Sequence, residues 1–424
     1  MIDEATGSVR PGQPPAIASP PLVAISLLNW NNWQDTLECL ESVRRLDYAN
    51  YLTVVVDNGS WDNSVERIRG WAKRTGRLPS SVEEGGGGGE HERNHPSPSL
   101  MKEGSLAFVE YTREQALRGG DPNSEAGLDA AQSLNRLVLI RNEENQGWTG
   151  GNNAAIHYAL TRHNPAKYIF LLNNDAEVDS ECVSTLVSVS QKADAGIVGG
   201  IPVEREDHGP RFEAALSFVR FLFGPLISPA IPYRGKDEFW KSGVVSGAAM
   251  LVRRDVLQTF YDANGEYLFT RLFMYWDDQA FCRAADKLQY LIVYARKAIV
   301  YHHQAGKSFG GILSPHLFYY RERNKILAAN MGLSLGWRIL FHILNPPLAL
   351  ARVIKYLRLQ PRLARAAFYG LLDGYRGIGG KWRDHDREML AKAALPAPDV
   401  KMVQPPDSSK VEQTGSGHMP SGEG

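Results

Sequence analysis

Cysteine is scarce in this chain, since only three occur among 424 residues, at positions 39, 182 and 282. Their wide separation fits neither a disulfide-stabilised domain nor the paired spacing of a structural zinc site, so we expect reduced, buried thiols. No run approaches about 18 uncharged apolar residues, which argues against a membrane-spanning helix. The N-terminal residues lack the apolar core of a signal peptide, and we expect a cytoplasmic protein.

Net charge is also absent. The 47 lysines and arginines are balanced by 47 aspartates and glutamates, which excludes the global positive field of a dedicated nucleic-acid binder. Hydrophobic residues make up 43% of the chain and aromatic residues 10%. This composition supplies a full core, so the chain as a whole is not intrinsically disordered. The length fits one large domain with appendages or two domains.

Short apolar runs alternate with amphipathic segments along most of the chain. The runs at 22–30, 52–56, 137–142 and 168–175 predict strands, and the segments at 33–46, 62–74 and 154–162 predict helices between them. Further strands are expected at 195–200 and 291–302, and residues 246–257 are expected to form a strand that runs into the start of a helix. Because single helices between strands imply right-handed crossovers, the pattern predicts an α/β fold with a mostly parallel sheet flanked by helices.

The composition changes in one internal segment and at both ends. Residues 76–133 contain five consecutive glycines at 85–89 and few periodic apolar positions. We interpret them as a flexible insertion, either passive or acting as an acceptor lid. The main domain is expected over residues 21–330 and a helical region over 331–393. Residues 1–20 and 394–424 are expected to be disordered tails.

The expected C-terminal helices are strongly basic. Between residues 331 and 383, nine lysines and arginines face a single acid, Asp373, and apolar stretches separate the charges. This pattern predicts a basic amphipathic extension. It either lies on an anionic membrane surface, which would make the protein peripheral to the inner face of the cell membrane, or packs on the main domain.

Polar residues end four of the predicted strands: Asn29, Asp57, Asn142 and Asn174. Ligands of such sheets bind beyond the carboxyl ends of the strands, so we expect these side chains to converge on one crevice. Asp57 either accepts a hydrogen bond from a base or ribose hydroxyl, or simply forms an Asp-Asn-Gly turn.

A metal site is suggested after the strand at 168–175. Asp175 lies in the segment NNDAEVD, and Mg2+ or Mn2+ commonly takes one or two carboxylates together with substrate phosphates. The alternative is that Asp175 caps the next helix. His303 follows the strand at 291–302, and its imidazole is able to join carboxylates around a manganese-type ion.

Two further segments suggest contacts with phosphate groups. The loop NQGWTGGNN at 145–153 opens a helix, and its glycines let backbone N–H groups approach a phosphate or sugar. It is not the GxGxxG fingerprint of dinucleotide binding. Arg323, in YYRERNK, either binds a diphosphate through its forked donors or lies on a solvated helix face.

Two adjacent carboxylates, Asp277 and Asp278, occur in the segment YWDDQAF. Neighbours on a helix point about 100° apart, so one is expected to face a substrate while the other braces it. A carboxylate near a helix N-terminus stays ionised, which suits a general base. The alternative is that both acids simply start a helix.

Eight stretches, taken in order, carry a family resemblance. They are ISLLNWNN, VVVDNGSWDNS, NQGWTGGNNAAI, FLLNNDAEV, SGAAMLVRRDV, FMYWDDQAFCRA, HHQAGKSFGG and YYRERNKI. Together they resemble the inverting family 2 glycosyltransferases of the GT-A fold, with the closest likeness to rhamnosyltransferase-like and galactofuranosyltransferase-like members. The resemblance covers about residues 21–331, apart from the insertion.

The resemblance implies roles for particular residues. Asp57 would contact the nucleotide, and the loop at 145–153 would lie along the donor. Asn173 replaces the first acid of the family's DxD motif, so Asp175 would hold most of the Mg2+ or Mn2+, together with His303. The residues implied to bind the nucleotide sugar are Asn29, Asp57, Gly147, Asn152, Asn173, Asn174 and Arg323.

The resemblance also implies a reaction. Asp278 would be the catalytic base, with Asp277 beside it, in a single displacement that inverts the anomeric carbon. The donor would be dTDP-rhamnose or a UDP-sugar, and the acceptor a hydroxyl of a glycan or lipid-linked saccharide in cell-envelope polysaccharide synthesis. Two alternatives remain: a nucleotide-sugar-binding protein without activity, and a Rossmann-type oxidoreductase. The second predicts a glycine fingerprint after Trp30, where the sequence has NNWQD instead.

Overall fold

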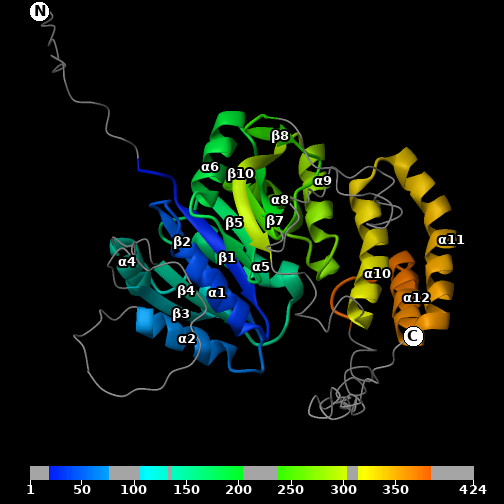
Figure 1. The fold of residues 1–424 in the computed structure, drawn as a ribbon, viewed down its shortest axis with the longest axis horizontal. Helices are drawn as coiled ribbons and strands as arrows, with labels where there is room; N and C mark the ends of the chain where they lie inside the picture. Colours follow the sequence, from blue (N-terminus) through cyan, green and yellow to red (C-terminus); the bar gives the residue numbers. More distant parts are fainter. Residues whose placement is uncertain (1–18, 76–105, 132–135, 204–235, 303–313, 383–424) are drawn as a thin grey trace, which may run out of the picture. The chain divides into compact units, whose positions relative to one another are not determined.

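A computed structural model describes residues 19–75, 106–131, 136–203, 236–302 and 314–382 (Figure 1). Within these ranges ten strands form one sheet in the order β3-β4-β2-β1-β5-β9-β7-β10-β6, with β8 paired to β10. The strands are β1 (Val23–Asn29), β2 (Tyr51–Asn58), β3 (Ala107–Thr112), β4 (Arg136–Asn142), β5 (Tyr168–Asn173), β6 (Ala176–Val178), β7 (Ile197–Val203), β8 (Phe239–Lys241), β9 (Ala249–Arg253) and β10 (Ile292–His302).

Five neighbouring strands, from β3 to β5, run parallel to one another. Strand β9 reverses direction and pairs antiparallel with both β5 and β7. The register places Asn29 of β1 opposite Asp57 of β2, and Leu28 opposite Asn173 of β5. The predicted α/β fold, a mixed and mostly parallel sheet flanked by helices, is therefore confirmed.

Helices cover both faces of the sheet. They are α1 (Trp33–Val43), α2 (Ser64–Thr75), α3 (Arg113–Leu117), α4 (Pro122–Ala130), α5 (Gly147–Thr161), α6 (Cys182–Ala193), α8 (Arg254–Asn264) and α9 (Asp277–Lys287), with a short 3-10 helix η1 (Thr270–Leu272). Helices α1, α2 and α6 contribute to one apolar core, and α5, α8 and α9 to the other. All of β2 is buried, as expected for a strand covered on both faces. The three cysteines are buried and unpaired, as predicted.

The predicted flexible insertion at 76–133 is wrong for residues 106–131. This part forms β3, which extends the sheet beside β4, followed by α3 and α4. Glu125 of α4 is buried, accepts hydrogen bonds from Tyr111 (2.9 Å) and Tyr158 (2.8 Å), and pairs with Arg162 (2.7 Å). One short strand and two short helices carry too little periodicity to stand out beside a glycine run. Residues 76–105 and 132–135 lie outside the described residues.

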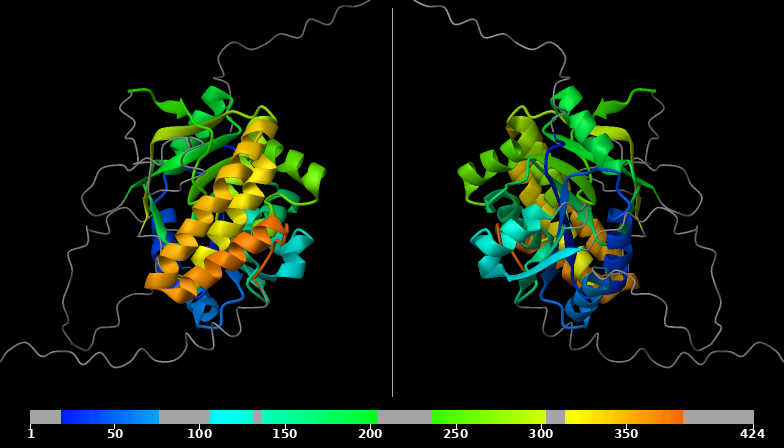
Figure 2. Two further views of the ribbon diagram at one scale, coloured as in Figure 1. Left: turned by 90° about the vertical axis from the view of Figure 1, so that its right-hand side faces the viewer. Right: turned by 90° about the vertical axis from the view of Figure 1, so that its left-hand side faces the viewer.

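Three helices follow in the C-terminal region: α10 (Pro315–Gly332), α11 (Leu335–Leu359) and α12 (Pro361–Tyr375). Figure 2 shows them side by side. The Tyr319 hydroxyl of α10 donates to Asp373 of α12 (2.7 Å), and Arg352 of α11 forms two hydrogen bonds with Glu322 of α10 (2.9 and 2.8 Å). The predicted helical extension is therefore present. No described helix is long and apolar enough to cross a bilayer.

Candidate active site

Side chains at the carboxyl ends of three adjacent strands are joined by hydrogen bonds. The amide of Asn29 donates to Asp57 (2.8 Å), and the Thr36 hydroxyl donates to Asn29 (2.8 Å). The amide of Asn174 donates to Thr36 in turn (2.9 Å). Asp57 also accepts from the Ser60 backbone N–H (3.1 Å). Hydrogen bonds therefore join three of the four strand-end residues that the sequence analysis named, with Thr36 of α1 as a link that sequence reasoning missed.

Asn58 joins the end of β2 to the loop at 145–147. Its amide donates to Asn145 (3.0 Å) and to the Gly147 carbonyl (3.1 Å), while its oxygen accepts from Asn142 (2.9 Å) and from the Gln146 N–H (3.1 Å). Sequence reasoning singled out its neighbour Asp57 and missed Asn58. The available signal was the position of Asn58: an amide side chain that is buried at the end of a strand needs several hydrogen-bond partners.

Helix α5 begins at Gly147, earlier than the predicted start at 154, because its glycines allow close packing. Gly147 has a φ of +73°, and a Cβ there would overlap the Phe273 carbonyl oxygen. Asn152 is buried within this helix, accepts from Ser26 (2.7 Å) and donates to the Trp148 carbonyl (2.9 Å). These contacts fasten the loop and helix to β1.

Trp148 lies between the end of β5 and the start of α9. Its indole N–H donates to Asn173 (3.3 Å), and a Cβ added at Gly247 would lie 3.1 Å from its ring. The Gly247 N–H donates to Asp278 (3.3 Å), and the same added Cβ would lie 3.4 Å from the Asp278 Cβ. Asn173 and Asp278, 105 residues apart in the sequence, are therefore connected through Trp148 and Gly247.

The carboxylates of Asp175 and Asp277 both influence Tyr275. Burial raises the pKa of the Tyr275 hydroxyl most, Arg321 lowers it, and Asp277 and Asp175 raise it further. Asp175 lies in the turn between β5 and β6, and Asp277 is the first residue of α9. The predicted metal ligand and the predicted acid pair therefore lie close enough to act on one phenol.

The two acids of the pair have different surroundings. Asp277 is buried, whereas Asp278 is half-buried. Burial, followed by the neighbouring charge of Asp278, raises the pKa of Asp277 well above the usual range for aspartate. Asp277 therefore holds its proton at pH values where an ordinary carboxyl is ionised, and Asp278 is the more accessible of the two carboxylates.

Three residues predicted to bind the donor have other roles in the structure. Asn29, Asn152 and Arg323 are completely or almost completely buried, and their polar groups bond to other parts of the chain. Asp57 is as deeply buried as Asn152, and its carboxylate accepts from Asn29 and Ser60. The Arg323 guanidinium donates to the Leu272 (3.0 Å) and Gly380 (2.6 Å) carbonyls. The forked donors of Arg323 suggested a phosphate ligand, but backbone carbonyls occupy them.

The described residues contain no group of three His, Cys, Asp or Glu side chains that would hold a metal by itself. Asp175 is half-buried at the carboxyl edge of the sheet and suits a site completed by phosphate oxygens. The other predicted metal ligand, His303, lies outside the described residues.

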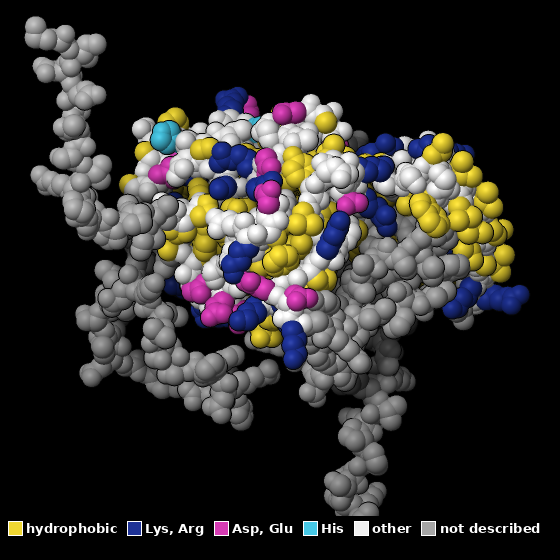
Figure 3. Space-filling view, turned by 90° about the horizontal axis from the view of Figure 1, so that it is seen from above, with side chains coloured by type: hydrophobic (Ala, Val, Ile, Leu, Met, Phe, Trp, Pro, Cys, Tyr) yellow, Lys and Arg dark blue, Asp and Glu magenta, His cyan; other side chains and the backbone are white. Residues whose placement is uncertain are grey.

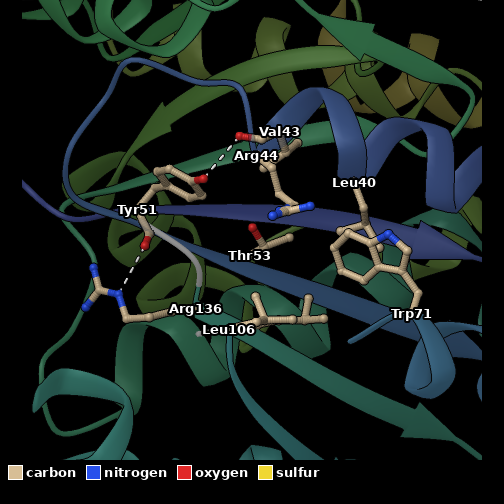
Figure 4. A pocket seen from close by; sticks show the side chains of 9 residues that line it. Leu40, Val43, Arg44, Tyr51, Thr53, Trp71, Leu106 and Arg136 are labelled. Carbon is tan, nitrogen blue, oxygen red and sulfur yellow. Dashed lines mark hydrogen bonds between the residues drawn. The ribbon is translucent and has the colours of Figure 1, made fainter. Parts of the chain in front are cut away.

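A small pocket occurs at the amino ends of the strands, opposite the candidate site (Figure 4). Tyr51 and Leu137 lie at the amino ends of their strands, and Trp71 of α2 lines the same pocket. The Tyr51 hydroxyl donates to the Val43 carbonyl (3.1 Å) and Arg136 donates to the Tyr51 carbonyl (3.2 Å). Ligands of parallel sheets bind at the carboxyl ends, so this pocket is not part of the candidate site.

The chain is similar to known glycosyltransferases. The family profile Glycosyl transferase family 2 matches residues 25–86 and 120–260. The low-salt glycan biosynthesis hexosyltransferase Agl10 of Haloferax volcanii is 26% identical over 254 residues, which cover 55% of this chain and 77% of that protein. The family match spans Asp57, Asn173 and Asp175 and ends before Asp278.

Solved structures also resemble the chain. The mannosyltransferase PcManGT from Pyrobaculum calidifontis, in complex with GDP-Man and Mn2+, is 15% identical, with a TM-score of 0.45 over 89% of this chain and 80% of that one. TarS 1–349 of S. aureus, in complex with UDP-GlcNAc, is 12% identical, with a TM-score of 0.41 over 85% and 93% of the two chains. The family match and the related hexosyltransferase lead to one conclusion: the chain is a glycosyltransferase that belongs to family 2.

Proposed function

We propose that the chain is a metal-dependent, inverting glycosyltransferase. Its donor would be dTDP-rhamnose or a UDP-sugar, and its acceptor a hydroxyl of a glycan or lipid-linked saccharide in cell-envelope polysaccharide synthesis. The observation that carries this proposal is the link from Asn173 through Trp148 and Gly247 to Asp278. It brings the edge of the sheet where Asp57 and Asp175 lie next to a carboxylate suited to general-base catalysis.

The proposed reaction is a single displacement. Asp278 accepts the proton of the acceptor hydroxyl while that oxygen bonds to the anomeric carbon of the donor. The bond between this carbon and the leaving diphosphate oxygen breaks on the opposite face, so the configuration inverts. Asp57, fixed by Asn29 and Ser60, would contact the nucleotide. A bound Mg2+ or Mn2+ would offset the negative charge that develops on the leaving group.

Asp175 is the proposed protein ligand of that metal. A hard divalent cation accepts one carboxylate when substrate phosphates and water fill its other positions. Asn174, whose side chain donates to Thr36, would hold the turn that presents Asp175. Asn173 and Gly147 would line the donor from β5 and the loop at 145–147.

We expect the full-length chain to release free nucleoside diphosphate from one class of donor when an acceptor saccharide and Mn2+ are present. The test is a panel of dTDP-, UDP- and GDP-sugars, with phosphate release measured after phosphatase coupling and with chelator as the control. Binding without release would favour a non-catalytic nucleotide-sugar protein. Thermal stabilisation by NAD alone would favour the oxidoreductase.

We also propose that α11 attaches the protein to an anionic membrane surface. Its residues Ile339, Ile343, Leu350, Ile354 and Leu357 recur at helical spacing and are each about half exposed or more. Figure 3 shows hydrophobic side chains gathered over the end of the molecule where α11 lies, with Lys and Arg beside them. An apolar face bordered by cations is the pattern of a helix lying in a lipid interface.

The charges of α11 and α12 complement an anionic surface. The exposed cations include Lys355, Arg358, Arg362 and Arg365, and the single acid of the two helices, Asp373, accepts a hydrogen bond from Tyr319. Such a surface attracts basic side chains by about 1 kcal/mol each. Attachment there would bring the site to a lipid-linked acceptor.

The membrane prediction is testable with one substitution. Ile343 is 64% exposed on the apolar face of α11, and Ile343→Glu should lower binding to phosphatidylglycerol vesicles about tenfold, because an apolar side chain worth roughly 1.5–3 kcal/mol is lost. Cosedimentation measures the bound fraction. Leu288→Glu adds the same charge at a 50% exposed leucine beyond α9 and should leave binding unchanged. Equal binding by both variants would contradict the role of α11.

A further inference from the structure

The segment just before the acid pair has an unusual backbone. Phe273, Tyr275 and Trp276 have φ values of +64°, +64° and +66°. They are three of the six non-glycine residues with positive φ in the part of the chain that the structure describes. Each such residue costs of order 1–3 kcal/mol and persists only where surrounding contacts enforce it. Trp276 directly precedes α9, so these dihedral angles set the direction in which Asp277 and Asp278 emerge.

Asn324 of α10 holds this segment through its backbone. Its amide nitrogen lies within hydrogen-bonding distance of the Leu272 (2.6 Å), Met274 (2.6 Å) and Tyr275 (3.0 Å) carbonyl oxygens. The side chain is completely buried. Because these three carbonyls all point toward the Asn324 amide, the orientations of the peptide planes between them are fixed. These orientations define the positive φ values of the segment.

Arg323 fixes the orientation of that amide. Its Nε donates to the Asn324 Oδ1 (2.7 Å), so the Asn324 nitrogen must face the loop. Its other donors reach the Leu272 (3.0 Å) and Gly380 (2.6 Å) carbonyls. The guanidinium lies 4.8 Å from the centre of the Tyr320 ring, which stacks on Phe273 with ring centres 5.2 Å apart.

The other side of the segment contacts the loop that carries Gly147. The Phe273 carbonyl accepts from the Thr149 N–H (3.3 Å), and a side chain at Gly147 would collide with Phe273. The strained residues therefore lie between the proposed donor loop and α10. A change on the α10 side would shift the acid pair without removing any group that is proposed to touch the donor.

We propose that Arg323 and Asn324 are positioning residues for catalysis: they hold residues 272–276 in the strained conformation that directs Asp278 toward Gly247. This inference rests on the proposed role of Asp278 as the base. Without the two side chains, Phe273, Tyr275 and Trp276 would relax toward negative φ, and the start of α9 would turn. Burying the Arg323 guanidinium costs desolvation free energy, so stability alone is a weak reason to retain it. Its role in fixing the conformation of residues 272–276 would explain why it is there.

The test compares Asn324→Leu and Arg323→Lys with Tyr319→Phe. Asn324→Leu keeps the branching at Cγ and removes the donor, and Arg323→Lys keeps the cation and loses the fork. Tyr319→Phe removes the part-buried hydrogen bond from the same helix to Asp373 and keeps the aromatic ring that lies 5.2 Å from the Arg323 guanidinium. For the first two variants, kcat should fall about tenfold to a hundredfold, since small misplacements of reacting groups cost this much. The KM for the donor should stay within about twofold.

The rates are divided by the folded fraction of each sample, measured by near-ultraviolet circular dichroism, so that instability does not count as lost catalysis. Tyr319→Phe should keep the wild-type kcat and KM. If both variants keep the wild-type kcat per folded molecule, or if kcat and KM change together, the positioning role is wrong. If Asp278→Asn itself remains active, the proposed base fails instead, so the two failures are distinguishable.

Discussion

Replacing Asp278 by asparagine should lower kcat for sugar transfer about a thousandfold, because a general base typically contributes a factor of about 100 to 10,000. Asparagine has nearly the same shape, and its oxygen is able to accept the hydrogen bond from the Gly247 N–H that Asp278 accepts now. Donor affinity should therefore change little. Initial rates of nucleoside diphosphate release measure kcat, and calorimetric titration with the nucleoside diphosphate measures affinity.

Asp277→Asn is the matched control. Burial and the charge of Asp278 raise the pKa of Asp277, so this residue resembles its own amide in the neutral range. Its replacement should lower kcat far less than that of Asp278. A similar loss in both variants, or near-normal turnover by Asp278→Asn, would contradict the assignment of Asp278 as the base.

Asp175→Ala should remove metal-dependent donor binding. With Mn2+ present, the affinity for UDP or dTDP should fall at least about a hundredfold, since even outer-shell changes at metal sites cost 10- to 100-fold. Thermal shift of the variant with the nucleotide, with and without Mn2+, measures the effect. The wild-type chain should be stabilised more when the metal is present, and the variant equally in both conditions.

Asp179→Ala serves as the control for charge. Asp179 lies four residues further along, where its carboxylate accepts from the Glu181 N–H (3.1 Å) before α6. This variant should keep the metal-dependent stabilisation. A metal effect that survives in Asp175→Ala would mean that other groups hold the cation.

The sheet and the polar strand ends that form the candidate site were predictable from the sequence because both depend on local signals. Uninterrupted apolar runs mark strands that are covered on both faces. A polar residue at the end of each run marks the edge where ligands bind. Asn29, Asp57 and Asn174 follow this rule, and the structure links them through Thr36.

The individual roles were less predictable because they depend on contacts distant in sequence. Arg323 and Asn324 are adjacent on α10, yet their partners are carbonyls about 50 residues earlier. A backbone carbonyl has no sequence signature, so YYRERNK suggested an anion site. The composition of residues 76–133 also led to a wrong prediction. The run of glycines indicated a flexible insertion, although a short edge strand lies near it within residues 106–131.

The chain of hydrogen bonds from Asn174 through Thr36 and Asn29 to Asp57 has a consequence for recognition. The buried Asn29 and Thr36 fix the rotamers of Asp57 and Asn174 before any ligand arrives. A nucleotide that met Asp57 or Asn174 would therefore lose little conformational entropy in ordering them. The protein would then discriminate among nucleotide bases by how well each base fits against these rigid side chains. A loop that reshapes itself around each candidate would discriminate less.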